Sequence, residues 1–255
     1  MDRLPPVGLG TSGIEDPDTI AMAIDLGYRH FDTAQIYGNE TIVGEGISRT
    51  NVDREELIVA TKVWTDRLGA DDVRPSVEES LNRLGLDHVD LLYVHWPRGD
   101  YEPNETLSAF DALVDDGIVE RVGLSNFSPT QLDEARDVLD HSIFAHQIER
   151  HPLFQSSELV AYAQDHDHTL VSYAPLMAGR ADERIELREI ADVHGVTPPE
   201  ISLAWVLSQE SVVAIPKASS RDHLRTNLEA KDIELTEDDI ARIEGIEREE
   251  ELYVD

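Results

Sequence analysis

The 255-residue sequence contains no cysteine, which excludes disulfide bonds, thiolate nucleophiles and cysteine-ligated zinc sites. It has no apolar run long enough to cross a bilayer. Its first six residues also lack the apolar stretch of a secretory signal. We therefore expect a cytoplasmic protein with no membrane partner, whose 40% hydrophobic content can still fill a sizeable core.

Lysine is scarce, and positive charge is heavily outnumbered. The three lysines are Lys62, Lys217 and Lys231, and 21 Lys and Arg face 53 Asp and Glu, for a net charge of −32. Because binding to phosphate needs basic residues, we expect no nucleic-acid partner. Self-repulsion of this size weakens a compact fold, and about 1 M salt, with a Debye length of roughly 3 Å, removes most of it. The acidic surface therefore indicates a halophilic protein from a salt-loaded cytoplasm, with acidity of no special meaning as the alternative.

Short apolar runs alternate with amphipathic stretches along the whole chain. Many of these runs are rich in Val and Ile, as buried parallel strands are. The predicted strands are 7–11, 28–33, 57–63, 89–95, 119–125, 143–149, 169–174 and 212–216. The predicted helices are 19–26, 40–47, 73–84, 105–114, 130–139, 158–164, 199–207 and 221–228.

Eight strands and eight helices in alternation predict an α/β fold, a (β/α)₈ TIM barrel in a single domain, residues 1–255. Two further segments are additions to this pattern, one at 185–193 and a last, C-terminal helix at 237–246. The pair Asp71-Asp72 is suited to cap the helix predicted at 73–84.

The stretch from Gly8 to Gly13 matches the G-x-G-x-x-G dinucleotide fingerprint, with Asp32 at a suitable spacing. A doubly wound dehydrogenase is therefore an alternative. Against it, residues 14–18 form a loop and cap where the fingerprint needs a helix. A first barrel strand turning into its loop is the favoured interpretation.

Ionisable residues stand at the ends of successive predicted strands. Asp32 ends the second, Lys62 the third and His95 the fourth, while Tyr37 lies in the loop after Asp32. Active sites of such barrels lie at the carboxyl ends of the strands. A lysine ammonium lowers the pKa of a nearby tyrosine hydroxyl from about 10. A carboxylate keeps that lysine charged, and a histidine orients a substrate oxygen. This set suits carbonyl reduction by a hydride-donating cofactor, although each residue alone is equally typical of a salt bridge or of packing.

Seven motifs in order resemble the aldo-keto reductase family, within its prokaryotic branch of aldehyde and 2,5-diketogluconate reductases. They span nearly the whole chain: 32–40, 61–64, 94–97, 123–127, 147–152, 172–176 and 215–217. The resemblance implies an oxidoreductase that reduces small aldehydes or ketones, including α-dicarbonyls or keto sugars, to alcohols with NADPH, NADH being a usable second cofactor. It implies a monomer whose partner is the carbonyl substrate, and it implies no metal.

The resemblance also implies roles for individual residues. Tyr37 would be the general acid, tuned by Lys62 paired with Asp32, and His95 would orient the carbonyl. The expected cofactor-binding residues are Ser125, Asn126, Gln147, Tyr173, Leu176, Lys217, His223 and Asn227, with Tyr173 stacked on the nicotinamide. Trp64, Trp96 and Phe127 would line an apolar substrate pocket, which the short tail after residue 246 is expected to leave open.

Some positions depart from the family pattern. The resemblance implies an N-terminal hairpin, which residues 3–7 are expected to supply only in reduced form. His223 stands where an arginine usually holds the 2′-phosphate of the cofactor, Ala218 and Ala174 replace serines, and Thr226 replaces a glutamate. These changes weaken the case for tight phosphate binding and leave the reaction centre intact. The alternative function is a non-catalytic subunit that binds nicotinamide and senses redox state.

Overall fold

The structure is a computed structural model that describes residues 3–246 and 250–253. Its strands pair in parallel and form one sheet in sequence order. They are β1 (Leu9–Gly10), β2 (His30–Asp32), β3 (Ile58–Val63), β4 (Leu91–Val94), β5 (Val122–Ser125), β6 (Ile143–Glu149), β7 (Thr169–Tyr173) and β8 (Val212–Ala214). Val7, just before β1, pairs in parallel with Ala214 of β8. The strand order therefore returns on itself, which is the topology of a (β/α)₈ barrel and confirms the predicted fold class.

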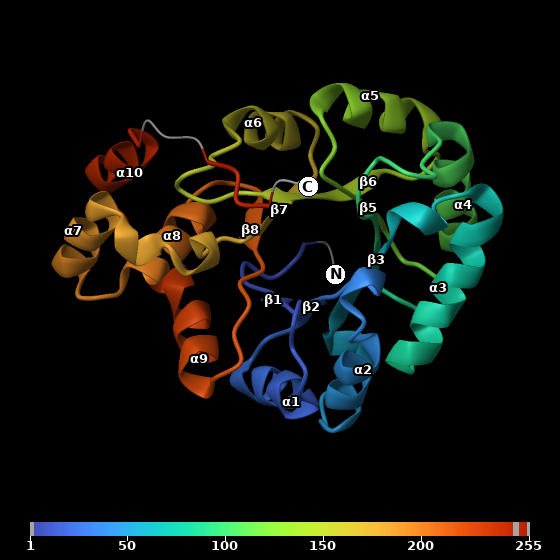
Figure 1. Ribbon diagram of the computed structural model, residues 1–255, viewed down its shortest axis with the longest axis horizontal. Coiled ribbons are helices and arrows are strands. Elements are labelled where there is room, and N and C mark those ends of the chain that lie inside the picture. Colours follow the sequence, from blue (N-terminus) through green and yellow to red (C-terminus); the bar gives the residue numbers. More distant parts are fainter. Residues whose placement is uncertain (1–2, 247–249, 254–255) are drawn as a thin grey trace. The chain divides into compact units, whose positions relative to one another are not determined.

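Helices alternate with these strands as predicted. They are α1 (Pro17–Leu26), α2 (Glu40–Ser48), α3 (Ala70–Leu84), α4 (Pro103–Asp115), α5 (Pro129–Val138), α6 (Ser157–Asp165), α8 (Pro198–Leu207) and α9 (Arg221–Glu229). The two added segments are also helical, as α7 (Ile185–His194) and α10 (Glu237–Glu244). Helices α2, α3 and α4 follow one another alongside β3 to β5 (Figure 1). Strands β2 to β5 are buried at every position, because helices cover one face of a parallel sheet and side chains fill the other.

The predicted start of α3 was wrong. The helix begins at Ala70, so Asp71 and Asp72 lie in its first turn, and the N-cap residue is Gly69, which has no side chain to accept a hydrogen bond. Both carboxylates still stabilise the helix, since negative charge is favourable near the positive end of the helix dipole. The acidic pair therefore stabilises the first turn of this helix through its negative charge, and it does not cap the helix.

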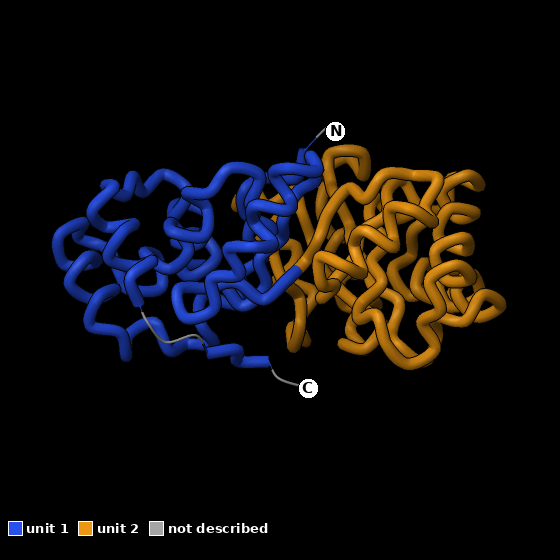
Figure 2. Tube along the Cα trace, turned by 90° about the horizontal axis from the view of Figure 1, so that it is seen from above, with its two compact units in different colours: residues 1–8, 148–255 blue, residues 9–147 orange. Residues whose placement is uncertain are grey.

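The chain divides into two compact units, coloured separately in Figure 2. The N-proximal unit is Leu9–Gln147, and the C-proximal unit comprises the described residues of 1–8 and 148–255. That the whole chain behaves as one domain stays a prediction. The expected N-terminal hairpin does not form within residues 3–8, where the only pairing is the bridge at Val7. Among the described residues, no helix has the length and apolar character needed to span a membrane.

Candidate active site

Three of the four predicted reaction-centre residues stand at or beside the carboxyl ends of adjacent strands in the N-proximal unit. Asp32 is the last residue of β2, Lys62 lies in β3, and His95 directly follows β4. Lys62 is fully buried and Asp32 is 1% exposed. The Lys62 Nζ donates to Asp32 Oδ1, and it also donates to the Thr33 carbonyl at 3.0 Å. The sequence-predicted lysine–carboxylate pair is therefore present, and water is excluded from it.

Tyr37, the fourth residue, ends a 3₁₀ turn, Gln35–Tyr37, directly after β2. The turn is held in place by side chains on both flanks. Gln35 accepts a hydrogen bond from the Trp64 backbone N–H at 3.0 Å, and the Asn39 amide donates to the Thr11 carbonyl at 2.7 Å. The chain then reverses at Gly38, whose φ of 67° is left-handed and favours glycine. Tyr37 is consequently fixed while its ring stays half-buried.

The hydroxyl of Tyr37 faces the Lys62 ammonium, with Nζ and Oη 3.4 Å apart. Burial alone lowers the pKa of Lys62, but Asp32 and Tyr37 outweigh burial, so the net pKa is raised and the ammonium stays charged. A buried ammonium at this distance favours the phenolate over the phenol. The geometry can therefore release a proton from Tyr37 and stabilise the anion left behind.

His95 is neutral at every physiological pH. Burial, the positive charge of Lys62 and that of Arg98 lower its pKa to about 2. Its ring lies edge-on to Tyr37, with 5.9 Å between ring centroids, and to Trp64 at 4.9 Å. A neutral imidazole carries one N–H donor, so His95 can donate a hydrogen bond to a carbonyl oxygen without competing with Tyr37 as an acid.

The next two strands contribute amide and hydroxyl groups. Ser125 ends β5, Asn126 follows it, and Gln147 lies in β6. The Asn126 Nδ2 donates to the His95 carbonyl and to Ser125 Oγ, both at 3.0 Å. Its φ of 64° is left-handed, a conformation that asparagine tolerates better than most residues. The Gln147 Nε2 donates to Asp32 Oδ2 at 2.7 Å, a contact that the sequence did not predict.

The three predicted pocket residues differ in exposure. Trp64 and Trp96 are half-buried, and Phe127 is 1% exposed. The ring of Phe127 is contacted edge-on by Tyr101, with centroids 5.5 Å apart. Tyr101 was missed from sequence because it lies in a polar loop after β4, where no periodicity indicates a partner. That these residues line a substrate pocket stays a prediction.

The remaining predicted cofactor residues belong to the C-proximal unit. Tyr173 ends β7 and is half-buried, as is Leu176 three residues later. Lys217 is exposed after β8, and His223 is exposed in the first turn of α9, where its backbone N–H donates to Ser220 Oγ. Asn227 on the same helix is buried. Each therefore lies on or just after the element that the sequence indicated.

Two observations in the C-proximal unit fit a cofactor that carries a phosphate group and a base able to hydrogen-bond to a side-chain amide. Lys217 and Arg221 form no ion pair with other described residues, in a chain with a large excess of carboxylates. Arg225, in contrast, is already engaged by Asp222 and Glu229. The Asn227 Nδ2 is buried and has no partner among the described residues, an arrangement that normally requires a ligand or water.

The C-terminal segment is bound to the same unit through residues 252 and 253. That the short tail leaves the substrate pocket open stays a prediction. The buried carboxylate of Glu149 accepts the Leu252 backbone N–H at 2.6 Å and that of Tyr253 at 3.1 Å. It also meets His151 Nε2 at 2.8 Å. The Tyr253 ring then stands edge-on to Tyr173, with 6.0 Å between centroids. Glu149 was missed because backbone donors leave no pattern in a sequence.

Replacing Glu149 with glutamine should release this segment, because hydrogen bonds to a charged acceptor are the stronger ones. We expect amide hydrogen exchange at residues 252 and 253 to accelerate by about 10-fold or more, measured on the folded protein by mass spectrometry. Glu158→Gln, at an exposed position of α6, is the matched control and should leave exchange unchanged. Equal exchange in both variants would show that Glu149 does not hold the tail.

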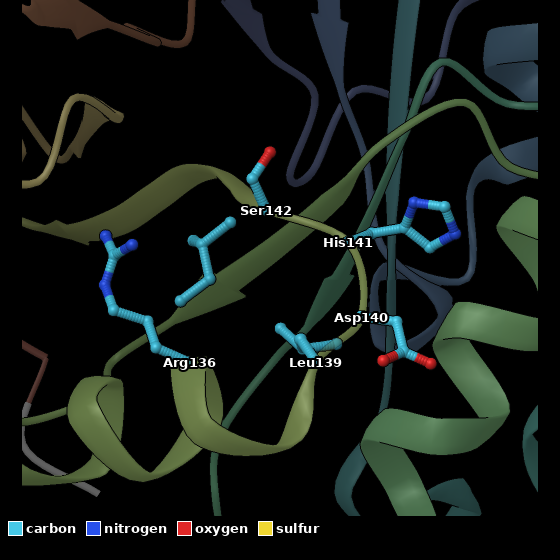
Figure 3. Close-up of a pocket in the computed structure, with 6 residues that line it drawn as sticks. Arg136, Leu139, Asp140, His141 and Ser142 are labelled. Atoms are coloured by element: carbon cyan, nitrogen blue, oxygen red, sulfur yellow. The ribbon is translucent and has the colours of Figure 1, made fainter.

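Two further polar groupings lie in the N-proximal unit away from Tyr37. His88, Asp90 and Glu120 offer ligand atoms within 4.8 Å of one another, but Asp90 is already bound by Arg54 at 2.7 Å. Figure 3 shows the residues that line a cavity at the α5–β6 connection, with the Arg136 and Ser142 side chains on one side and Asp140 and His141 on the other. Neither adds a group to the reaction centre, and the absence of a metal requirement stays a prediction.

The chain matches known proteins over nearly its whole length. The aldo/keto reductase family model matches residues 7–248. The chain is 35% identical over 254 residues to methylglyoxal reductase DkgB of Escherichia coli O157:H7, covering 96% of this chain and 93% of that protein. It is 34% identical over 257 residues to the 9,11-endoperoxide prostaglandin H2 reductase of Trypanosoma cruzi, covering 98% and 90%.

A solved structure also matches this chain. An aldo-keto reductase from a Medee basin deep-sea metagenome library superposes with a TM-score of 0.93 at 32% identity, covering 99% of this chain and 94% of that one. The chain therefore belongs to the aldo/keto reductase family and is an oxidoreductase of that family. The resemblance seen in the sequence and the predicted enzyme class are confirmed. Enzymes of this family use NAD(P)H and small carbonyl substrates.

Proposed function

We propose that this protein reduces small aldehydes and ketones to alcohols, with NADPH as the preferred cofactor and Tyr37 as the proton donor. The observation that carries the proposal is the buried arrangement of Asp32, Lys62 and Tyr37 beside a neutral His95. Each member of that arrangement has a distinct task in carbonyl reduction. No other cluster among the described residues combines a proton donor with a fixed ammonium.

The chain's own residues carry the proton side of the reaction. Tyr37 Oη gives its proton to the carbonyl oxygen, and Lys62 stabilises the resulting phenolate. His95 donates a hydrogen bond to the same oxygen and fixes its direction. Asp32 keeps the Lys62 ammonium in place, so the charge next to Tyr37 is preorganised rather than recruited during the reaction. The bound nicotinamide supplies the hydride to the carbonyl carbon.

Groups in each of the two units support binding of NADPH. In the N-proximal unit, Ser125, Asn126 and Gln147 present the hydroxyl and amides that would bind a carboxamide. In the C-proximal unit, Tyr173 would stack on the nicotinamide and Leu176 would contact the cofactor. Lys217 and the start of α9 would hold a phosphate, since a helix N-terminus and a free cation both favour an anion. Asn227 would bind the base.

We infer that α-dicarbonyls are among the substrates. A relative that is 35% identical is named a methylglyoxal reductase. In this chain the half-buried Trp64 ring lies edge-on to His95, with 4.9 Å between ring centroids. Function in the cytoplasm and as a monomer, both expected from the sequence, stay predictions.

The proposal is tested by giving the purified protein NADPH and methylglyoxal, and then a keto sugar, in high salt. We expect cofactor oxidation matched by formation of the alcohol. A protein that binds NADPH and oxidises none of it with any small carbonyl would instead be the non-catalytic redox sensor.

Cofactor preference gives a further prediction. A 2′-phosphate carries close to two negative charges and is bound best by arginine, whereas His223 is exposed and sits where the family has arginine. Lys217 and Arg221 partly replace it, so we expect NADPH to be preferred by a modest margin, with NADH usable. His223→Arg should raise the NADPH preference, chiefly through a lower KM.

The measurement is kcat/KM for both cofactors in the parent and the variant. His166→Arg, at an exposed position after α6, adds the same charge elsewhere and is the matched control. A strong NADH preference in the parent protein would overturn the NADPH assignment.

A further inference from the structure

The two oxygens of the Asp32 carboxylate have different partners. Oδ1 accepts from the Lys62 ammonium, and Oδ2 accepts from the Gln147 amide at 2.7 Å. Asp32 is 1% exposed and Gln147 is 2% exposed, so no bulk water competes for either oxygen. A hydrogen bond to a buried carboxylate is charge-assisted and correspondingly strong.

The expected role of Gln147 in binding the carboxamide does not explain this contact. Ser125 has the same expected role, and its hydroxyl accepts from Asn126 Nδ2 at 3.0 Å, with no hydrogen bond to Asp32 among those of the described residues. In the protein without cofactor, Gln147 therefore binds the Asp32 carboxylate, whereas Ser125 does not.

We propose that Gln147 is a positioning residue for the acid: it holds the second oxygen of Asp32 and so controls how closely that carboxylate neutralises Lys62. The proposal rests on the proposed function, because it acts on Tyr37 through Asp32 and Lys62. The glutamine amide has two N–H groups, so one can stay on Asp32 while the other meets a carboxamide. One side chain would then serve both the cofactor and the proton donor.

The consequence for Tyr37 follows from charge. Without the hydrogen bond from Gln147, the negative charge of Asp32 is balanced by Lys62 alone. The carboxylate then neutralises more of the ammonium's charge, and the ammonium stabilises the Tyr37 phenolate less. The pKa of Tyr37 should therefore rise. The other titratable groups facing this cluster are His30 on β2, whose pKa burial lowers to about 4, and His95. Both are neutral where a tyrosine titrates.

Tyr93 on β4 is the remaining neighbour. Burial raises its pKa well above 10, with the negative charge of Asp32 adding to the effect and Gln147 opposing it. Its titration is thereby separated from that of Tyr37, and a difference measurement can isolate the Tyr37 phenol.

The test uses the protein without cofactor. Phenolate absorbance is titrated against pH in the parent and in Gln147→Met, and the curve of the same background carrying Tyr37→Phe is subtracted from each. We expect the Tyr37 transition to move up by about one pH unit in Gln147→Met. Ser125→Ala, which removes another expected carboxamide ligand without touching Asp32, is the matched control and should leave the transition in place. Circular dichroism confirms that each variant is folded.

The outcomes separate the two proposals. An unchanged transition in Gln147→Met, even with weaker NADPH binding, would overturn the positioning role and leave the proposed function standing. A Tyr37 transition near pH 10 in the parent would contradict the tuning of Tyr37 by Lys62 and, because the positioning role acts through Lys62, would overturn that role as well. If Gln147→Met does not fold, Gln147→Asn, which shortens the amide out of reach, takes its place with the same expected shift.

The loaded enzyme gives a second readout. Reduction requires protonated Tyr37, so kcat/KM for the carbonyl falls as the pH rises through the pKa of that phenol. In Gln147→Met this alkaline limb should move to higher pH in step with the absorbance titration, whereas in Ser125→Ala it should stay. A limb that moves equally in both variants would assign the effect to cofactor binding and contradict the proposal.

Discussion

Tyr37→Phe should lower kcat by a factor of about 10² or more while NADPH still binds. The variant keeps the aromatic ring that meets His95 edge-on and removes only the hydroxyl next to the Lys62 ammonium. His95 cannot substitute as the acid, because with a pKa of about 2 it is a neutral imidazole, whose remaining N–H donates hydrogen bonds but is far too weakly acidic to be transferred. The variant would then depend on water reaching the carbonyl for the proton.

The measurement is steady-state kcat together with the NADPH dissociation constant from fluorescence titration. Tyr162→Phe, on α6 and stacked on His166, removes a hydroxyl elsewhere and should behave like the parent. Activity of Tyr37→Phe within a factor of a few of the parent would mean that another group supplies the proton.

Thermal stability should rise steeply with salt, which is the second large effect. The net charge of −32 is unscreened at low ionic strength, and the native state concentrates that charge. Many arginines form exposed ion pairs, such as Arg67–Glu79 and Arg242–Glu189. Each such pair contributes little to the free energy of unfolding. Screening by salt therefore removes more repulsion than attraction. A gain of several kcal/mol corresponds to a rise in Tm on the order of 10 °C.

The experiment records Tm from low to multimolar KCl. Screening predicts that most of the rise is complete near 1 M, where the Debye length is about 3 Å. A rise that continues linearly to saturation would indicate preferential exclusion of salt from the surface instead. A flat Tm would remove the halophilic interpretation and leave the proposed reaction untouched.

Hydrophobic periodicity was sufficient to predict the fold because it is a local property. The strands β3 and β6 lie within a residue of their predicted bounds, since runs of Val and Ile between polar turns have few other ways to be buried. The start of α3 was misplaced because Asp71 and Asp72 stabilise a helix from its first turn as well as from its cap. Local charge alone does not distinguish these positions.

The grouping of Asp32, Lys62, Tyr37 and His95 was predictable because these residues stand at or just after the carboxyl ends of consecutive strands, which parallel topology brings together. The further contacts made around these side chains and at the C-terminal segment could not be predicted from the sequence. Gln147 meets Asp32 across 115 residues of sequence, and Glu149 binds backbone N–H groups of a tail about 100 residues away. Neither partner is marked by residue type, spacing or periodicity, so only coordinates identify them.

We propose that this protein itself moves a hydride from nicotinamide to a carbonyl while Tyr37 supplies the proton. The most direct measurement uses NADPH carrying deuterium at the transferring position of nicotinamide C4, methylglyoxal as the carbonyl, and mass spectrometry of the product. We expect the parent protein to form an alcohol with one deuterium on the former carbonyl carbon, and Tyr37→Phe to form almost none in the same time. An alcohol without deuterium, or bound NADPH with no alcohol at all, would contradict it.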